Sequence, residues 1–442
     1  MLEYLTFTLI VSGCFFIKNE SKILYFFLIF IPFHSFIKSC FAYFFGGGEV
    51  FSYWKEIVVL IFALKIYKTS KLKVNSHISL LLMIYTFIIF IYFFISNIYE
   101  VALPTLRDHL FPLIFFVSIY KMKFDNIIYG RLILVITISL FLTDFFGLIQ
   151  HFFLNEQLSQ IMGRIDFIDE TGYIQYTTNS ARIMGFERMA GILGGGPNMF
   201  GIFNGFSIVF LSGVLTNRDK SIISKRVSKF IIFTLMISLL CIILSFSRAG
   251  WAIVLTGIII LLILNKKINR LKYFAFFAFS SFLVILIVSI YSSEVYDIIY
   301  NSVTAKEASA SKRSEMITEL IPIILDEPFG HGLGTTDNRY KTKLFFAESA
   351  FTNIAFEIGI LGFFYLILMH FKILRQIRKI VSSNYFSKIS LAIGMASLVV
   401  SFVSVNTYGM PYIYLWWFIL GIGINKSNLI GRRINRGSFV LN

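Results

Sequence analysis

Long apolar runs alternate with short polar links over nearly the whole chain. A helix needs about 20 mostly apolar residues to cross the hydrocarbon core of a bilayer, and such runs recur from end to end. We expect spans at residues 2–17, 23–45, 50–66, 78–98, 103–120, 127–153, 197–216, 229–247, 250–265, 272–292, 350–371, 389–407 and 411–424. The first run is short and the second carries His34 and Lys38, so twelve or thirteen spans are expected. The pattern predicts an all-α polytopic membrane protein, with residues 1–442 as a single integral membrane domain.

The links between the runs predict the orientation of the chain. Lys and Arg gather in the links at residues 65–73, 121–131, 218–229, 266–272 and 372–388 and in the C-terminal tail. Such links usually stay in the cytoplasm, and placing all of them there agrees with every intervening span. The C-terminus is then cytoplasmic. Residues 155–196 and 292–349 form two extracytoplasmic loops. The N-terminal run lacks a small-residue cleavage site, so we expect it to be retained.

Composition and charge fit the same interpretation. Hydrophobic residues make up 57% of the chain and charged residues only 14%, against about 25% charged in soluble domains. The net charge of +16 lies in the links, which indicates a lipid bilayer partner and no nucleic acid. Cys14, Cys40 and Cys241 are isolated within apolar runs, so neither a disulfide framework nor a zinc site is expected.

The second loop contains a stretch with helical periodicity. Met316, Leu320, Ile323 and Ile324 recur at helical spacing, and Pro328 follows. We expect a short amphipathic helix over residues 311–324 that either lies on the membrane face or packs against the bundle.

The first loop ends in a candidate phosphate site. Arg188 precedes a run of glycines at 194–196, then Pro197 and Asn198 open the next span. Pro suits the first turn of a helix, and a helix N-terminus attracts anions. Arg188 and Asn198 are therefore candidates for substrate binding, with Arg182 of the same loop, although a plain junction between loop and span has the same pattern.

Two further arginines are candidate catalytic residues. Arg248 follows Ser247 in a short link between two spans, where an arginine either snorkels to the interface or binds an anionic lipid-linked substrate. Arg313 opens the expected amphipathic helix, where it either binds substrate or is solvated. Guanidinium suits phosphate because it is always charged and donates two parallel hydrogen bonds.

His331 and Glu348 are candidates for proton transfer. His331 lies between Gly330 and Gly332, as either a proton carrier or a loop residue. Glu348 lies where the second loop meets the next span. There it acts either as a general base with a raised pKa or as a cap of the helix N-terminus. His331 and Glu187 are next in line as the base.

Several common motifs are missing from the sequence. There is no Gly-x-x-x-x-Gly-Lys phosphate loop, no Asp-x-Asp pair for a metal-bound nucleotide and no His-Glu-x-x-His. We therefore expect neither a nucleotide-sugar transferase nor an ATP-driven pump, and no metal or other cofactor.

The order of these motifs resembles the bacterial O-antigen polymerase and O-antigen ligase superfamily. It runs through Arg188-x-x-Gly191 with Pro197-Asn198, Ser247-Arg248, Arg313 with Pro328-Phe329-Gly330-His331-Gly332-Leu333-Gly334, Glu348-Ser349, and Glu357-Ile358-Gly359-Ile360-Leu361-Gly362. The glycine run is one residue tighter after the proline than the family pattern. The resemblance covers roughly residues 103–362.

The resemblance implies a GT-C-like fold in the bacterial cytoplasmic (inner) membrane, with the active site on the periplasmic or extracellular face. It implies a metal-independent glycosyltransferase whose donor and acceptor are undecaprenyl-pyrophosphate-linked oligosaccharides, with a chain-length regulator protein as a further partner. Arg248 and Arg313 would hold the pyrophosphate. Ligases of the family have His where Glu348 stands, so a polymerase for O-antigen or another surface polysaccharide is favoured. Transfer to lipid A core by a ligase is the first alternative, and a lipid-linked oligosaccharide flippase is the second.

Overall fold

The computed structural model describes residues 2–72, 74–154, 188–217, 222–265, 321–336, 349–381 and 384–425. It also describes residues 158 and 161–162 and the backbone of four short strands in the first loop. The helices in these parts are α1 (Leu2–Phe16), α2 (Glu20–Phe30), α3 (His34–Phe45), α4 (Trp54–Thr69), α5 (Ser76–Ile95), α6 (Tyr99–Lys121), α7 (Asn126–Phe153), α9 (Gly196–Thr216), α10 (Lys225–Ser245), α11 (Arg248–Leu264), α15 (Ala350–Lys379), α16 (Ser387–Ser401) and α17 (Tyr412–Ile424). Three short 3₁₀ helices join them: η1 (Ile31–Phe33), η2 (Phe51–Tyr53) and η4 (Val405–Tyr408).

The chain is a multi-pass membrane protein, as the sequence predicts. Seven helices or continuous helix pairs in the described residues are long and apolar enough to span a bilayer, and four shorter apolar helices accompany them. Every expected span coincides with a helix, or with consecutive helices, except 272–292, which lies outside the described residues. α1 runs beside α4, and hydrogen bonds join them at both ends. At one end Glu3 accepts from the Phe51 N–H at 2.7 Å, and at the other Lys65 donates to the Cys14, Phe15 and Ile17 carbonyls.

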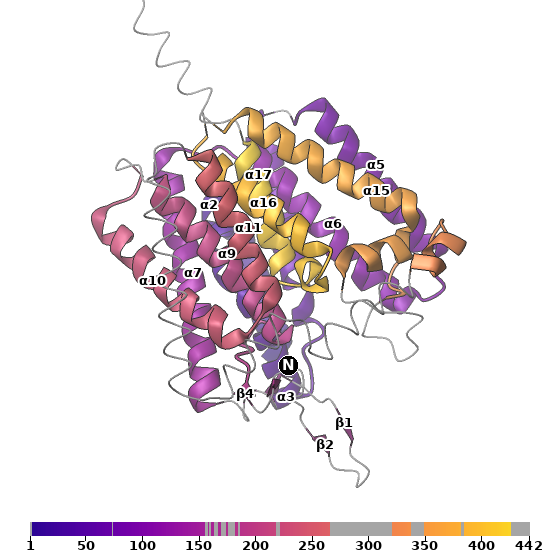
Figure 1. Cartoon of the computed structure of the whole chain (residues 1–442), viewed down its shortest axis with the longest axis horizontal. Helices are drawn as coiled ribbons and strands as arrows, with labels where there is room; N and C mark the ends of the chain where they lie inside the picture. Colours follow the sequence, from indigo (N-terminus) through magenta and orange to yellow (C-terminus); the bar gives the residue numbers. More distant parts are fainter. Residues whose placement is uncertain are drawn as a thin grey trace, which may run out of the picture.

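Two ends of the bundle carry different links (Figure 1). The loop end is where α7 and α10 finish and where α9, α11 and α15 begin, and it carries the first loop. Within that loop β1 (Phe167–Ile168) pairs antiparallel with β2 (Ile174–Gln175), and β3 (Arg182–Ile183) pairs with β4 (Phe186–Glu187). The basic end is opposite and carries the described parts of the links between α4 and α5, α6 and α7, and α15 and α16, which together with the adjoining helix ends are rich in Lys and Arg.

Helix α9 forms the centre of one half of the bundle and is almost entirely buried. Glycines bring α11 against it. A Cβ atom built on Gly250 would lie 2.3 Å from the Gly201 carbonyl oxygen, and one on Gly205 would lie 2.6 Å from the Gly250 oxygen. Lipid gives little hydrophobic drive for helix association, so close packing of this kind holds membrane helices together. The crossing brings the first residues of α9 and α11 together at the loop end.

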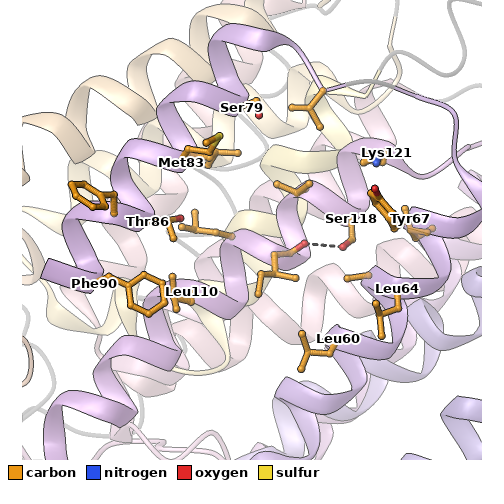
Figure 2. A pocket seen from close by; sticks show the side chains of 18 residues that line it. Leu60, Leu64, Tyr67, Ser79, Met83, Thr86, Phe90, Leu110, Ser118 and Lys121 are labelled. Carbon is orange, nitrogen blue, oxygen red and sulfur yellow. Dashed lines mark hydrogen bonds between the residues drawn. The ribbon is translucent and has the colours of Figure 1, made fainter. Parts of the chain in front are cut away.

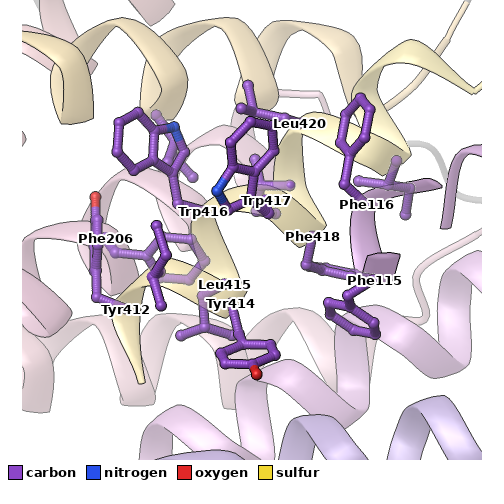
Figure 3. Packing of buried hydrophobic residues seen from close by; sticks show 14 of the residues in the cluster. Phe115, Phe116, Phe206, Tyr412, Tyr414, Leu415, Trp416, Trp417, Phe418 and Leu420 are labelled. Atoms are coloured by element: carbon purple, nitrogen blue, oxygen red, sulfur yellow. The ribbon is translucent and has the colours of Figure 1, made fainter. Parts of the chain in front are cut away.

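The other half of the bundle packs around α17, all of whose residues are buried. Its aromatic side chains meet those of α6 and α9 (Figure 3): the ring centroids of Phe116 and Trp417 are 5.4 Å apart, and those of Phe206 and Tyr412 are 6.1 Å apart. At the basic end the Asn425 amide donates to the carbonyls of Ile119, Tyr120 and Met122. Carbonyls at the end of α6 therefore gain a partner that hydrocarbon would not provide.

An apolar cavity of about 880 Å³ opens between α4, α5 and α6 (Figure 2). Leu60, Met83, Phe90 and Leu110 are among the side chains that line it, and Lys121 lies at its edge. It is remote from the loop end, and its lining suits hydrocarbon rather than a sugar.

Substitution at the crossing of α9 and α11 tests this packing. Gly250→Ala should lower the free energy of unfolding by about 1–3 kcal/mol, because the new methyl group forces the two backbones apart. Gly13→Ala is the matched control: a Cβ atom there meets nothing within 4 Å. It should be neutral or stabilise the helix by up to about 1 kcal/mol. Denaturant unfolding in detergent measures both, and equal stability of the two variants would contradict the packing described.

Candidate functional site

The turn between α10 and α11 is held by Arg188. Its Nε donates to the Ser245 carbonyl at 2.9 Å, and one terminal nitrogen donates to Asn198 Oδ1 at 2.8 Å and to the Phe246 carbonyl at 3.4 Å. The side chain is only 9% exposed. The last carbonyls of a helix lack partners within it and carry partial negative charge. Arg188 therefore satisfies the end of α10 and ties it to the start of α9.

The same turn contains a strained residue. Phe246 has φ 48° and ψ 34°, in the left-handed region that costs an ordinary residue about 1–2 kcal/mol. Strain of this kind persists only where neighbours fix the backbone, and it concentrates at functional sites. Here the Arg188 hydrogen bonds fix it, and Ser247 and Arg248 follow directly.

Two helix N-termini meet beside this turn. Ser247 caps α11 by accepting from the Gly250 N–H, and its hydroxyl lies 3.4 Å from the Asn198 carbonyl at the start of α9. α9 begins without a side-chain cap, so its first N–H groups keep their capacity to bind an anion. Half-buried Arg248 is the first residue of α11. Arg248 and two positive helix ends therefore lie within a few residues of one another.

The 3₁₀ helix η4 connects this region to the start of α15. Thr407 of η4 is 2.8 Å from the Ser401 hydroxyl, and the Ser349 hydroxyl donates to the Ser401 carbonyl at 3.4 Å. On its other side η4 reaches α9, because a Cβ atom built on Gly195 would lie 3.3 Å from Asn406 Oδ1. The residue that follows Glu348 is thus fixed to the same support as the start of α9.

Residues 328–336, which we call the glycine loop, dock onto a break in α15. Gly359 has φ 69° and ψ 170°, a conformation that is essentially restricted to glycine. The loop repairs the interrupted ladder: the His331 N–H donates to the Phe356 carbonyl, the Gly332 N–H to the Glu357 carbonyl and the Ile360 N–H to the Pro328 carbonyl, at 2.9–3.0 Å. A Cβ atom on Gly330 would lie 2.4 Å from Gly359 N. A side chain at either Gly330 or Gly359 would therefore prevent this contact.

The far side of the glycine loop binds the turn between α5 and α6. The Leu333 N–H donates to the Tyr92 carbonyl at 3.1 Å, and the Ser96 hydroxyl donates to the Leu333 carbonyl at 2.8 Å. At the end of the loop, the Thr336 hydroxyl and the Thr336 N–H both donate to Glu357 Oε1 of α15, at 2.6 Å and 3.2 Å. Sequence reasoning missed this role of Glu357, although a carboxylate within an apolar run was the signal.

His331 belongs to the glycine loop and lies where this loop contacts α15. Its ring stacks on Phe356 with centroids 4.0 Å apart, and its Nδ1 is 3.1 Å from Glu327 Oε2. The helical residues 321–326 precede this loop, and Ile324 packs against Ala355 and Phe356. This contact favours packing on the bundle for the end of the expected amphipathic helix, while residues 311–320 lie outside the described residues.

A buried ion cluster lies near the loop end of α4 and α6. Lys55 Nζ is 2.7 Å from Glu56 Oε1, and Arg107 Nε is 3.9 Å from the same oxygen, with its guanidinium 4.5 Å from the Tyr53 ring centroid. Two cations therefore share the carboxylate of Glu56 in this cluster. Asp144, deeper in the bundle, accepts from Ser238 at 2.5 Å.

Tyr408 of η4 adds a hydroxyl to this end of the bundle. Its ring lies 6.2 Å from that of His109, whose Nδ1 is 3.0 Å from the Tyr85 hydroxyl. Burial raises the pKa of the Tyr408 hydroxyl well above its usual value, so the group stays protonated at neutral pH.

The structure brings several of the predicted site residues together. Arg188, Asn198 and Arg248 share one site, whereas His331 lies on the separate glycine loop. For Arg182 only the backbone is described, paired with Glu187. Glu348 and Arg313 lie outside the described residues. Among those described, no group of three or more His, Cys, Asp or Glu side chains is arranged to hold a metal ion.

Comparison with known protein families finds a similarity over part of the chain. Residues 233–367 match the profile of the Wzy_C family, described as O-Antigen ligase. The resemblance to the O-antigen polymerase and ligase superfamily is thereby confirmed, and the match indicates an activity of that type in a membrane glycosyltransferase. The matched segment includes Arg248, Arg313 and Glu348. No curated protein matches the chain.

The hydrogen bonds of Arg188 predict a stability effect. Arg188→Ala should lower the free energy of unfolding by about 2–4 kcal/mol, because hydrogen bonds to a charged group contribute about 1.5–3 kcal/mol each and the α10 carbonyls lose their partner. Arg226→Ala, at an exposed position on α10, removes the same charge and should change stability by no more than about 0.5 kcal/mol. If both variants unfold at the same denaturant concentration, Arg188 does not hold the turn.

Proposed function

From the match of residues 233–367 to the O-antigen ligase family, we propose that this protein polymerises a surface polysaccharide. It transfers a growing glycan from undecaprenyl pyrophosphate onto a new undecaprenyl-pyrophosphate-linked repeat unit. The reaction takes place at the loop end, which faces away from the cytoplasm of a bacterial inner membrane. The observation that carries the proposal is the convergence of Arg248 with the starts of α9 and α11, linked through η4 to the start of α15.

The donor's pyrophosphate binds at the meeting point of the two helix starts. A helix N-terminus carries about half a positive charge, and the first turn of α9 has no side-chain cap. Arg248 adds a full charge and two parallel donors. Arg313 is the second arginine that the family resemblance assigns to the pyrophosphate. Arg188 acts as a positioning residue, because two of its described hydrogen bonds go to the turn that carries Arg248 and one goes to Asn198 at the start of α9.

Glu348 is the proposed general base. It directly precedes Ser349, whose hydroxyl caps α15 by accepting from the Thr352 N–H at 3.2 Å. Ser349 therefore supplies the side-chain cap that was the alternative role for Glu348. η4 holds Ser349 and the start of α9 on one support, which favours a base and a pyrophosphate site that face the same substrate.

The proposed reaction is a single displacement. The acceptor sugar's hydroxyl oxygen attacks the anomeric carbon of the donor, and the bond from that carbon to the pyrophosphate oxygen breaks. Glu348 takes the hydroxyl proton, and undecaprenyl pyrophosphate leaves with the bonding electron pair. Arg248 and Arg313 stabilise the charge that develops on the leaving group.

The acceptor separates this proposal from its alternatives. Purified protein in liposomes would receive lipid-linked repeat units as its sole substrate, and the products would be resolved by length. A ladder of glycans is expected. A ligase would form product only after lipid A core is added, and a flippase would move the repeat unit across the bilayer without lengthening it. Either of these results would overturn the proposal.

Arg248→Lys tests the pyrophosphate site. The charge is kept while bidentate geometry is lost, so polymerisation should fall by about 10²-fold or more. Arg226→Lys makes the same change at the basic end and should leave the rate unchanged. Rates would be measured at matched amounts of folded protein. Near-normal long products from Arg248→Lys would remove Arg248 from the mechanism.

Glu348→Gln tests the base. Gln cannot accept a proton, so turnover should fall by about 10²–10⁴-fold while substrate binding persists. Glu348→His should keep part of the activity, since neutral imidazole is also a base near neutral pH.

The matched control for Glu348→Gln is Glu100→Gln. Glu100 is an exposed carboxylate in the first turn of α6 at the same end of the bundle. If Glu348 only stabilises the start of its helix, both Gln variants should lose about 0.3–1 kcal/mol of stability and no activity. Full activity of Glu348→Gln would place the base elsewhere.

A further inference from the structure

A second pocket, lined by both basic and apolar side chains, lies at the basic end between the start of α5 and the end of α15. Its volume is about 420 Å³, within the size range of small-molecule sites. Its lining comprises Asn75, His77, Ile78, Leu80, Leu81, Lys372, Arg375, Gln376 and Lys379. The two helices run side by side at the edge of the bundle (Figure 1), and the Tyr365 hydroxyl of α15 donates to the Leu81 carbonyl of α5 at 3.0 Å.

The charge of this pocket has one sign. Lys372, Arg375 and Lys379 follow one another at spacings of three and four residues, which places them on one face of α15. The described lining contains no carboxylate. A helix C-terminus stabilises cations only in its last turn, which explains Lys379 but not Lys372 or Arg375. Like charges at these spacings repel one another, so the pocket is suited to an anion.

The start of α5 adds to the positive potential. α5 begins at Ser76, and Asn75 caps it by accepting from the His77 N–H at 3.0 Å. The positive end of the α5 dipole therefore points at the space that the α15 cations surround.

The remaining wall of the pocket is hydrocarbon. Leu80 is exposed, and Ile84, Phe87 and Ile91 continue its exposed stripe along α5 away from the basic end. α15 presents a similar stripe, made of Leu368, Phe364 and Leu361. A soluble anion would use only the charged part of this site, whereas a lipid would use both parts.

We propose that this pocket binds the phosphate of an anionic phospholipid from the leaflet at the basic end, with the acyl chains lying along the exposed stripes of α5 and α15. Basic pockets between membrane helices on the cytoplasmic side recognise such headgroups. The cavity in Figure 2 is a weaker candidate, because the Nζ of its one lysine, Lys121, already lies 4.8 Å from the Tyr67 ring centroid. Occupation of the pocket would hold α5 and α15 together at the end opposite to the glycine loop.

Native mass spectrometry of the delipidated full chain tests the proposal. Phosphatidylglycerol and phosphatidylcholine with identical acyl chains would be titrated separately into the protein in detergent. Phosphatidylglycerol should bind at least about tenfold more tightly, since each cation near the membrane surface contributes roughly a fivefold gain for an anionic lipid. The double variant Lys372→Gln/Arg375→Gln should weaken phosphatidylglycerol binding by about 30-fold and leave phosphatidylcholine binding unchanged.

The double variant Lys225→Gln/Lys229→Gln is the matched control. It removes two exposed charges four residues apart on α10, at the same end of the bundle, and should keep the preference for phosphatidylglycerol. Equal binding of the two lipids, or an equal loss in both double variants, would overturn the proposal. Full displacement of phosphatidylglycerol by millimolar inorganic phosphate would also overturn it, because the site would then belong to a soluble anion.

Discussion

Every break in a helix of this protein must be repaired by the protein itself, because hydrocarbon offers no hydrogen bonds to a free backbone group. Three breaks near the loop end show how this is done. The glycine loop fills the gap at Gly359 of α15 and satisfies the Tyr92 carbonyl of α5. Arg188 satisfies the last carbonyls of α10. Loops that look irregular in sequence are therefore structural parts of the bundle. Their conformation is fixed by the helix ends to which they donate hydrogen bonds.

The same constraint connects architecture to chemistry. A helix start in a membrane protein has free N–H groups, and the bundle places two of them beside Arg248. The glycines at the crossing of α9 and α11 bring these starts close together, and η4 connects them to α15. Near α4 and α6, by contrast, the buried Lys55 and Arg107 both lie close to the single carboxylate of Glu56. The proposed anion site is thus distinct from the buried ion cluster of α4 and α6.

The sequence was sufficient to predict a multi-pass helical membrane protein and the positions of its described helices, because the thickness of hydrocarbon imposes a length and a composition on each apolar run. The candidate arginines near the helix starts could be located for a related reason, since a charge beside an apolar span is costly and therefore stands out. Their roles in binding substrate stay predictions. The docking of Pro328–Gly334 onto Gly359 was not predictable. No periodicity joins a loop to a helix break 30 residues later, and the conformation of Gly359 is decided by partners distant in sequence. The contacts of Arg188 were missed because they depend on where α10 ends in space. Arg313 and Glu348 lie outside the described residues, so their placement stays a prediction as well.

The break at Gly359 bears on how the chain is assembled. When α15 enters the membrane its interrupted backbone is incomplete, and the groups that complete it come from residues 328–332, synthesised just before it. Those residues in turn rest on α5 and on the turn at Ser96, which are made much earlier. α15 is therefore a late element in biogenesis: its insertion as a finished span waits for a surface that the first third of the chain has already built.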